Sequence, residues 1–288
     1  MKIWLGKRLV RLLAWLPLSG IRGLAVVLGW LVWLTPGPWL KRQKRQIELN
    51  LSTAFPELDV QELKRLQRQN LIEMFSTMLE IGPIWYRSGE WIQRRFKRSG
   101  WHHLERAQQR GKGVLMISGH LGNWEAGIMY VTQLLPLVYL YKPPRSNELD
   151  EFLTARRSRF GGEFAAAGSA AMRRLVRQLR QGGVAGLLFD QRPKGGDSVQ
   201  APFFNRTVDT MTLVHQLSAR TGCSVLFADV RRRPARRGWE VRIGPLHEDF
   251  SSLTPAQAAA LLNAELERRI REVPAQYLWQ YPRFERGG

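Results

Sequence analysis

The feature that most constrains the fold of this chain is an alternation of short apolar runs with amphipathic stretches from about residue 95 onward. Apolar runs that are buried on both sides and separated by helices are typical of a largely parallel sheet. We therefore expect a layered α/β fold with helices on both faces of a central sheet. The strand candidates are Val114–Ile117, Leu137–Leu140, Val184–Phe189, Val225–Val230 and Trp239–Ile243. The helix candidates are Glu125–Leu135, Leu149–Phe160, Ala170–Gln181, Thr210–Thr221 and Pro255–Glu272.

The first forty residues have a different character. Basic residues come first, a long apolar stretch follows, and no cleavage site of the small-x-small type comes after it, so residues 1–40 are expected to form a retained, helical membrane anchor. The unbroken apolar run over 23–35 is shorter than the roughly 20 residues that a spanning helix needs. Extending the run back to Leu12 would place Arg22 inside the bilayer, which is costly. A spanning helix and an in-plane anchor both stay open.

We expect two parts in the chain. Residues 1–40 would form the anchor, and residues 41–288 a second domain with a helical lead-in over 41–94 and an α/β core over 95–288. Apolar residues recur at steps of three and four within 60–81, which indicates helix. The sequence does not indicate an oligomeric state.

The chain is strongly basic, with a formal net charge of +20, and most of the excess comes from arginine. Arginine pairs with phosphate and carboxylate in two-point fashion, so the charge indicates an anionic partner. Nucleic acid, an anionic membrane and an acidic protein all carry such charge. The motifs of nucleic-acid-binding modules are missing from the sequence, and the apolar N-terminus favours a membrane instead.

The segment GVLMISGHLGNWEAG, residues 113–127, carries the clearest chemical pattern. A strand is expected to end at Ile117, and Asn123 is a good N-cap for a helix that begins at Trp124. Glu125 in the first turn of that helix could hold one ring nitrogen of His120 as a donor and leave the other free to accept a proton. A pair of this kind can activate a substrate hydroxyl group as a general base and its orienting acid.

Metal and cysteine chemistry are not indicated. His102 and His103 are adjacent and have no partner at ligand spacing, so no metal site is expected. Cys223 is the single cysteine, which excludes an intrachain disulfide and fits a reducing compartment. We interpret Cys223 as a small buried apolar residue.

His-x4-Glu after a strand, here HLGNWE, resembles the signature of the glycerolipid acyltransferase superfamily in its lipid A (lauroyl/myristoyl) branch. Three further blocks support the resemblance: YKPPRSNELDEFLTARRSRFG at 141–161, LLFDQRPKGGDSVQAPFF at 187–204 and PAQYLWQYPRF at 274–284. Asn205, Leu226 and the run 280–282 depart from the family pattern without touching His120 or Glu125.

The resemblance implies an enzyme without a cofactor that transfers a secondary acyl chain from acyl carrier protein to a hydroxyl of a lipid A precursor. It places the enzyme at the cytoplasmic face of the bacterial inner membrane. His120 and Glu125 would be catalytic, Arg157 would serve the active site and the oxyanion, and Asp190 and Gln191 would fix the site through hydrogen bonds. Arg145 and Asn123 complete the expected substrate-binding residues.

Alternatives remain at this point. The acceptor could be a lysophospholipid, an ornithine lipid or another glycolipid, and a non-catalytic membrane-bound binding protein could share the fold. Trp124, Met129 and Phe203 are candidate liners of an acyl groove. The arginine-rich run 231–237 between two strand candidates is expected to form a surface loop of the hairpin type.

Overall fold

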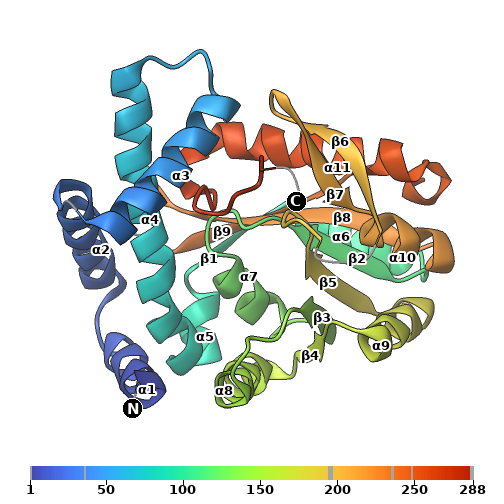
Figure 1. Ribbon diagram of the computed structural model, residues 1–288. Helices are drawn as coiled ribbons and strands as arrows, with labels where there is room; N and C mark the ends of the chain where they lie inside the picture. The colour runs from blue at the N-terminus through green and yellow to red at the C-terminus, as the bar shows by residue number, and fades with distance from the viewer. Residues whose placement is uncertain (1, 36, 194–196, 235–236, 248, 286–288) are drawn as a thin grey trace.

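The computed structural model describes residues 2–35, 37–193, 197–234, 237–247 and 249–285. Its centre is a seven-stranded sheet in the order β1-β9-β8-β2-β5-β3-β4, with helices on both faces (Figure 1). Strands β8, β2, β5, β3 and β4 are parallel, whereas β9 is antiparallel to β8 and parallel to β1. The strands of this sheet are β1 (Phe96–Ser99), β2 (Val114–Ser118), β3 (Leu137–Tyr141), β4 (Glu163–Ala166), β5 (Val184–Leu188), β8 (Ser224–Arg232) and β9 (Trp239–Pro245). The mostly parallel α/β fold expected from the sequence is confirmed.

The side chains of β2 alternate between two apolar clusters. Leu115 and Ile117 pack with residues of α9 (Ser169–Arg180), α10 (Leu213–Thr221) and α11 (Pro255–Glu272) on one face of the sheet. Val114 and Met116 pack on the other face. The helices of that second face are α5 (Gly89–Gln93), α6 (Trp101–Gln109), α7 (Trp124–Val131) and α8 (Asn147–Arg157). Burial on both faces explains why these strands are continuous apolar runs.

The chain begins with the helices α1 (Lys2–Leu13), α2 (Leu18–Leu34), α3 (Pro38–Ala54) and α4 (Val60–Tyr86). Helix α4 begins at a capping box, in which Asp59 accepts from the first turn and Glu62 accepts from the Asp59 backbone N–H. Helices α1 and α2 lie along α4 at one side of the molecule (Figure 1). Close approach there requires small residues, since a Cβ on Gly29 of α2 would lie 2.5 Å from the Ile72 side chain of α4.

The N-terminal helices differ from one form of the expected anchor. Among the described residues, no helix is both long and apolar enough to cross a membrane. Arg22 of α2 is 9 % exposed and contacts Glu80 of α4. That residues 1–40 form a unit of their own stays a prediction.

Several element boundaries differ from those expected. The helix expected from Thr210 begins at Leu213, because Arg206–Met211 forms β7, which pairs with β6 (Ser198–Phe203) in a separate antiparallel hairpin. The sequence did not indicate β1, β4, β6 or β7, because these strands are short or mostly polar and so lack an apolar run. The helix expected to reach Phe160 ends as α8 at Arg157 and continues as the 3-10 turn η1 (Ser158–Phe160). Two further short 3-10 turns are η3 (Phe250–Ser252) and η4 (Pro274–Gln276).

Candidate active site

The loop after β2, residues 119–123, lies at the carboxyl edge of the parallel strands. Gly122 has φ 67°, and a Cβ there would lie 1.8 Å from the carbonyl oxygen of Val230, so only glycine fits this turn. The loop is also tied to the C-terminal segment, because the Gly122 N–H donates to Gln276 and the Leu278 N–H donates to the His120 carbonyl. Helix α7 then begins under the N-cap of Asn123, as the sequence predicted.

His120 is paired with Asp190. The ring Nδ1 lies 2.7 Å from Oδ1 of Asp190, and the backbone N–H of His120 donates to Oδ2 at 2.8 Å. Asp190 is 2 % exposed, whereas the His120 side chain is 15 % exposed. Two-point binding fixes the ring, and an ionised Asp190 favours the tautomer with the proton on Nδ1 and a free Nε2. This pair has the geometry of a general base and its orienting acid.

The prediction that Glu125 pairs with His120 is wrong. Glu125 is buried in the first turn of α7, and its carboxylate accepts two-point hydrogen bonds from Arg157 at 2.8–3.2 Å and one from Trp85 Nε1 at 2.8 Å. Asp190 takes the place beside His120 because β5 is the parallel neighbour of β2, which brings the ends of both strands together. The sequence spacing alone could not show this adjacency.

Arg157 and Glu125 form a half-buried ion pair next to the loop. Burial alone would lower the pKa of the Arg157 guanidinium, but the Glu125 carboxylate outweighs it and raises that pKa above its ordinary value. The described hydrogen bonds of Arg157 use Nε and Nη2. Arg157 is thus a charged group held by Glu125, in the first turn of the helix that follows the loop. Its role in the site stays a prediction.

Burial alone would raise the pKa of Asp190. Its ion pair and hydrogen bonds with His120, together with Arg283, outweigh burial and hold the pKa of that carboxyl below its ordinary value. Asp190 is therefore a carboxylate at neutral pH and a hydrogen-bond acceptor only.

Two further predicted residues have different positions. The Gln191 side-chain nitrogen lies 3.4 Å from His120 Nε2 and can donate a hydrogen bond to it. This is a contact of the kind expected from the sequence, in which Gln191 fixes the site through hydrogen bonds. Arg145 is exposed on the loop between β3 and α8, at the same edge of the sheet. The structure shows no contact between Arg145 and His120. Residues 194–196 of the third sequence block lie outside the described residues.

Asn123 does not have the position expected of a substrate-binding residue. It is 0 % exposed, its Oδ1 accepts from the Ala126 N–H, and its Nδ2 donates to Glu80 at 2.7 Å. Glu80 is itself 0 % exposed and also accepts from Arg22, Arg232 and Trp239 at 2.7–3.1 Å. Glu80 thereby connects α2, α4, the β8–β9 hairpin and the loop of residues 119–123 through hydrogen bonds. Nothing in the helical pattern of the sequence marks Glu80 as part of the site.

Glu80 is charged despite its burial. Burial alone would raise its pKa, but Arg232, Arg22 and Asn123 outweigh that effect and hold the pKa of the Glu80 carboxyl below its ordinary value.

The arginine-rich run 231–237 differs in part from the expected surface loop. The hairpin is confirmed, but Arg231 and Arg232 belong to β8, are 8 % exposed and form ion pairs instead of facing solvent. Residues 235–236 of that run lie outside the described residues.

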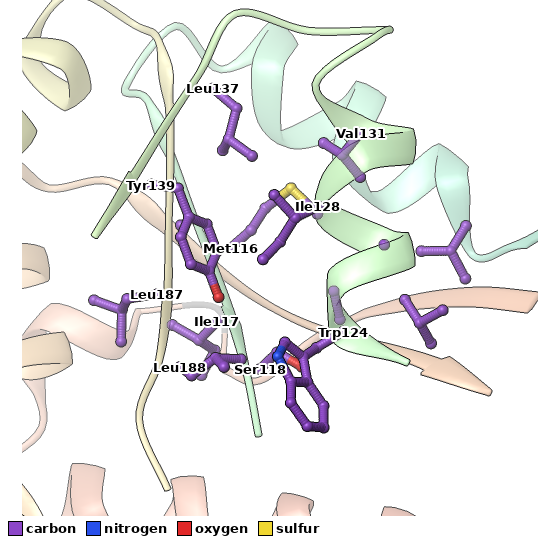
Figure 2. Close-up of a pocket in the computed structure, with 15 residues that line it drawn as sticks. Met116, Ile117, Ser118, Trp124, Ile128, Val131, Leu137, Tyr139, Leu187 and Leu188 are labelled. Carbon is purple, nitrogen blue, oxygen red and sulfur yellow. The ribbon is translucent and has the colours of Figure 1, made fainter. Parts of the chain in front are cut away.

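An apolar pocket extends from the active-site loop between α7 and the sheet (Figure 2). Trp124 and Ser118 lie at one end, and Leu137 and Val131 lie at the other. The Trp124 ring also makes an edge contact with the His120 ring, with centroids 4.7 Å apart. The cavity volume of the pocket is about 50 Å³. Of the residues expected from sequence to line an acyl groove, Trp124 lines this pocket, whereas Met129 and Phe203 pack in the two cores and do not line it.

The other sequence expectations concern packing and metal binding. Cys223 is 5 % exposed, which agrees with a small buried apolar residue. Trp279 and Arg283 of the closing block are 1 % and 2 % exposed, and Arg283 donates to Asp209 and Thr210 of β7. Within the described parts of the chain, no group of three or more potential metal-ligating side chains is present.

Comparison with known proteins shows the family to which this chain belongs. The family model described as bacterial lipid A biosynthesis acyltransferase matches residues 1–286. The chain is 28 % identical to the lipid A biosynthesis palmitoleoyltransferase of Escherichia coli (strain K12) over 86 % of this chain and 80 % of that protein. It is 28 % identical to a lipid A biosynthesis acyltransferase of Haemophilus influenzae over 96 % and 85 % of the two chains. It is 26 % identical to the lipid A biosynthesis lauroyltransferase of Escherichia coli (strain K12) over 98 % and 90 %. The chain therefore belongs to the bacterial lipid A biosynthesis acyltransferase family.

Proposed function

We propose that this acyltransferase moves a fatty acyl group from acyl carrier protein to a hydroxyl group of a lipid A precursor, with His120 as general base. The observation that carries the proposal is the His120–Asp190 pair, because the His120 ring also makes an edge contact with Trp124, which lines an apolar pocket. A pocket of this kind suits a hydrocarbon chain, because its walls are almost wholly apolar. The family membership supports the acyl transfer and the lipid acceptor.

The chemistry needs no nucleophile from the protein. Nε2 of His120 removes the proton of the acceptor hydroxyl as its oxygen attacks the thioester carbon. The C–S bond of the resulting tetrahedral intermediate then breaks, the ester C–O bond remains, and the proton passes from Nε2 to the leaving thiolate. Asp190 stabilises the imidazolium formed between these steps.

The negative charge on the tetrahedral oxygen needs a positive or hydrogen-bonding partner. Arg157 is the described charged group best suited to this task, since Glu125 holds it in place by two-point contact. We therefore assign Glu125 the role of positioning Arg157, in place of the role first expected for it beside His120.

The donor and the membrane are proposed on charge and exposure. A net charge of +20 favours an acidic carrier protein and an anionic membrane surface. Apolar side chains of α1, α2 and the turn between them remain exposed, including Leu12 at 65 %, Trp15 at 76 % and Leu34 at 69 %. We propose that these helices lie in the interface of the cytoplasmic face of the inner membrane.

The test of the proposed function is acyl transfer by the purified protein. Lauroyl and palmitoleoyl carrier proteins are supplied with a lipid A precursor that lacks secondary chains, and the products are weighed by mass spectrometry. The wild type is expected to add one acyl chain, and His120→Ala is expected to lose activity by about 10²- to 10⁴-fold. Acylation of a lysophospholipid but not of the lipid A precursor would contradict the acceptor. Equal activity of His120→Ala and wild type would contradict the mechanism.

The membrane proposal has its own test in flotation with vesicles that contain anionic lipid. Trp15→Glu combined with Leu12→Glu is expected to reduce the bound fraction. Val60→Glu is the matched control, because Val60 is 66 % exposed on α4, outside the α1–α2 face. Equal reduction by the control and the double variant would contradict docking through α1 and α2.

A further inference from the structure

One buried polar group in the apolar pocket is not used by the mechanism above. Tyr139, in the middle of β3, is 9 % exposed and lines the pocket. Its hydroxyl oxygen has no hydrogen-bond partner among the described residues. The side chains of Asp190, Glu125 and Asn123, by contrast, are paired. A buried hydroxyl without a partner is unfavourable, so we looked for a ligand atom with which this hydroxyl could form a hydrogen bond.

The hydroxyl has a definite direction. Figure 2 shows the Tyr139 ring extending along the pocket, with its oxygen toward Ile117 and Leu188 and away from Leu137. The oxygen therefore faces the end of the pocket where Ser118 and Trp124 lie, which is the end next to His120.

The chain also makes room for the ring in this direction. Gly186 of β5 lies opposite Tyr139 in the sheet, and a Cβ on Gly186 would lie 2.8 Å from the Tyr139 ring. Glycine at this position thus allows the ring to lie flat against the strand. Burial raises the pKa of the Tyr139 phenol, so its hydroxyl keeps its proton and can donate.

We propose that the Tyr139 hydroxyl donates a hydrogen bond to an oxygen atom of the bound acyl group, near its thioester end. This inference rests on the proposed function, in which the acyl chain occupies the pocket. Two oxygens have the required chemistry: the thioester carbonyl and a hydroxyl on a hydroxylated acyl chain. A site that pairs a buried donor with a substrate oxygen discriminates against substrates that lack that oxygen.

The test compares Tyr139→Phe with wild type in three quantities. These are kcat/KM, the affinity for acyl-loaded carrier protein measured without acceptor, and the Tm of the protein without ligand. Lauroyl and 3-hydroxylauroyl carrier proteins are the two donors. Tyr139→Phe is expected to lose about tenfold to a hundredfold in kcat/KM. Its Tm is expected to equal or exceed that of wild type, because the change removes an unpaired buried hydroxyl. Loss with both donors assigns the bond to the thioester carbonyl, and loss with the hydroxylated donor alone assigns it to the chain hydroxyl.

Tyr130→Phe is the matched control. Tyr130 lies on α7 at 2 % exposure, and its hydroxyl accepts a hydrogen bond from Arg98. This variant is expected to lose Tm and keep kcat/KM, the reverse of Tyr139→Phe. Equal rates and affinities of Tyr139→Phe and wild type would overturn the inference, and so would a fall in Tm like that of the control. If the wild type transferred no acyl group, the proposed function would fail, and the affinity for the two carrier proteins would still decide the role of Tyr139.

Discussion

Two buried carboxylates, Asp190 and Glu80, contact the loop of residues 119–123 through different residues and in different surroundings. Asp190 contacts His120, and the ring that it orients is partly exposed. Glu80 contacts Asn123, is 0 % exposed and is surrounded by two arginines and a tryptophan. Both pKa values lie below their ordinary values. We therefore assign Asp190 to the proposed reaction and Glu80 to the assembly of the fold.

The comparison predicts that the two carboxylates separate activity from stability. The largest effect is expected for Asp190→Asn. The new amide can still accept from the His120 N–H while turning its NH₂ toward the ring, which favours the tautomer with the proton on Nε2 and removes the base. We expect kcat/KM to fall by about 10³- to 10⁴-fold, with a much smaller change in the free energy of unfolding. A denaturant titration beside the rate measurement checks both, and a rate within tenfold of wild type would contradict the role of Asp190.

The second prediction concerns Glu80→Gln, which leaves Arg22 and Arg232 buried without their shared acid. Removing one partner of a buried ion pair costs about 3–5 kcal/mol in the free energy of unfolding. Glu73→Gln is the matched control, because Glu73 lies on the same helix and pairs with the same Arg232 from a partly exposed position. The control is expected to lose about 1 kcal/mol or less. Equal losses in the two variants would refute the central place of Glu80.

The third prediction is the pH dependence of that loss. Because the folded-state pKa of Glu80 is depressed, its contribution to stability is fully present above its unfolded value of about 4.5. The contribution is lost as pH falls through the folded-state pKa. The difference in unfolding free energy between wild type and Glu80→Gln should therefore be largest near neutral pH and shrink in acid. Urea titrations of both proteins from pH 7 to pH 3 measure it, and a constant difference would count against a charged Glu80.

The smallest effect is expected for Asn123→Ser, which touches the point where Glu80 meets the loop. Serine keeps a side-chain oxygen for the helix N-cap but is too short to reach Glu80 in the same way. We expect a loss of about 1 kcal/mol in stability and a few-fold loss in kcat. Thermal unfolding and steady-state kinetics check the pair of values. A loss of activity as large as that of Asp190→Asn would contradict the assignment of Asn123 to the structural surroundings of Glu80.

The sequence predicted β2, β3 and β5 well because each is a short apolar run that is largely buried. It predicted His120, Arg157, Asp190 and Gln191 as site residues, because HLGNWE and the later blocks carry a recognisable pattern. It assigned the wrong acid to His120, because spacing along the chain favours Glu125, while strand adjacency brings Asp190 to the ring.

Long-range contacts limited the rest of the prediction. Glu80 and its partners Arg22 and Arg232 are separated by 58 and 152 residues, so no local pattern marks them as a cluster. Arg231 and Arg232 looked like solvated loop residues because burial of paired charges leaves no apolar signal in the sequence. Tyr139 was placed correctly in a strand, but its unpaired hydroxyl became visible only with the pocket around it.

The most direct test of the central claim is the protonation of the His120 ring in Asp190→Asn and Glu125→Gln. Nitrogen NMR of histidine-labelled protein, at a pH where the ring is neutral, reports which nitrogen carries the proton. We predict that the proton lies on Nδ1 in wild type and in Glu125→Gln, and that it shifts toward Nε2 in Asp190→Asn. An unchanged ring in Asp190→Asn together with a changed ring in Glu125→Gln would contradict it.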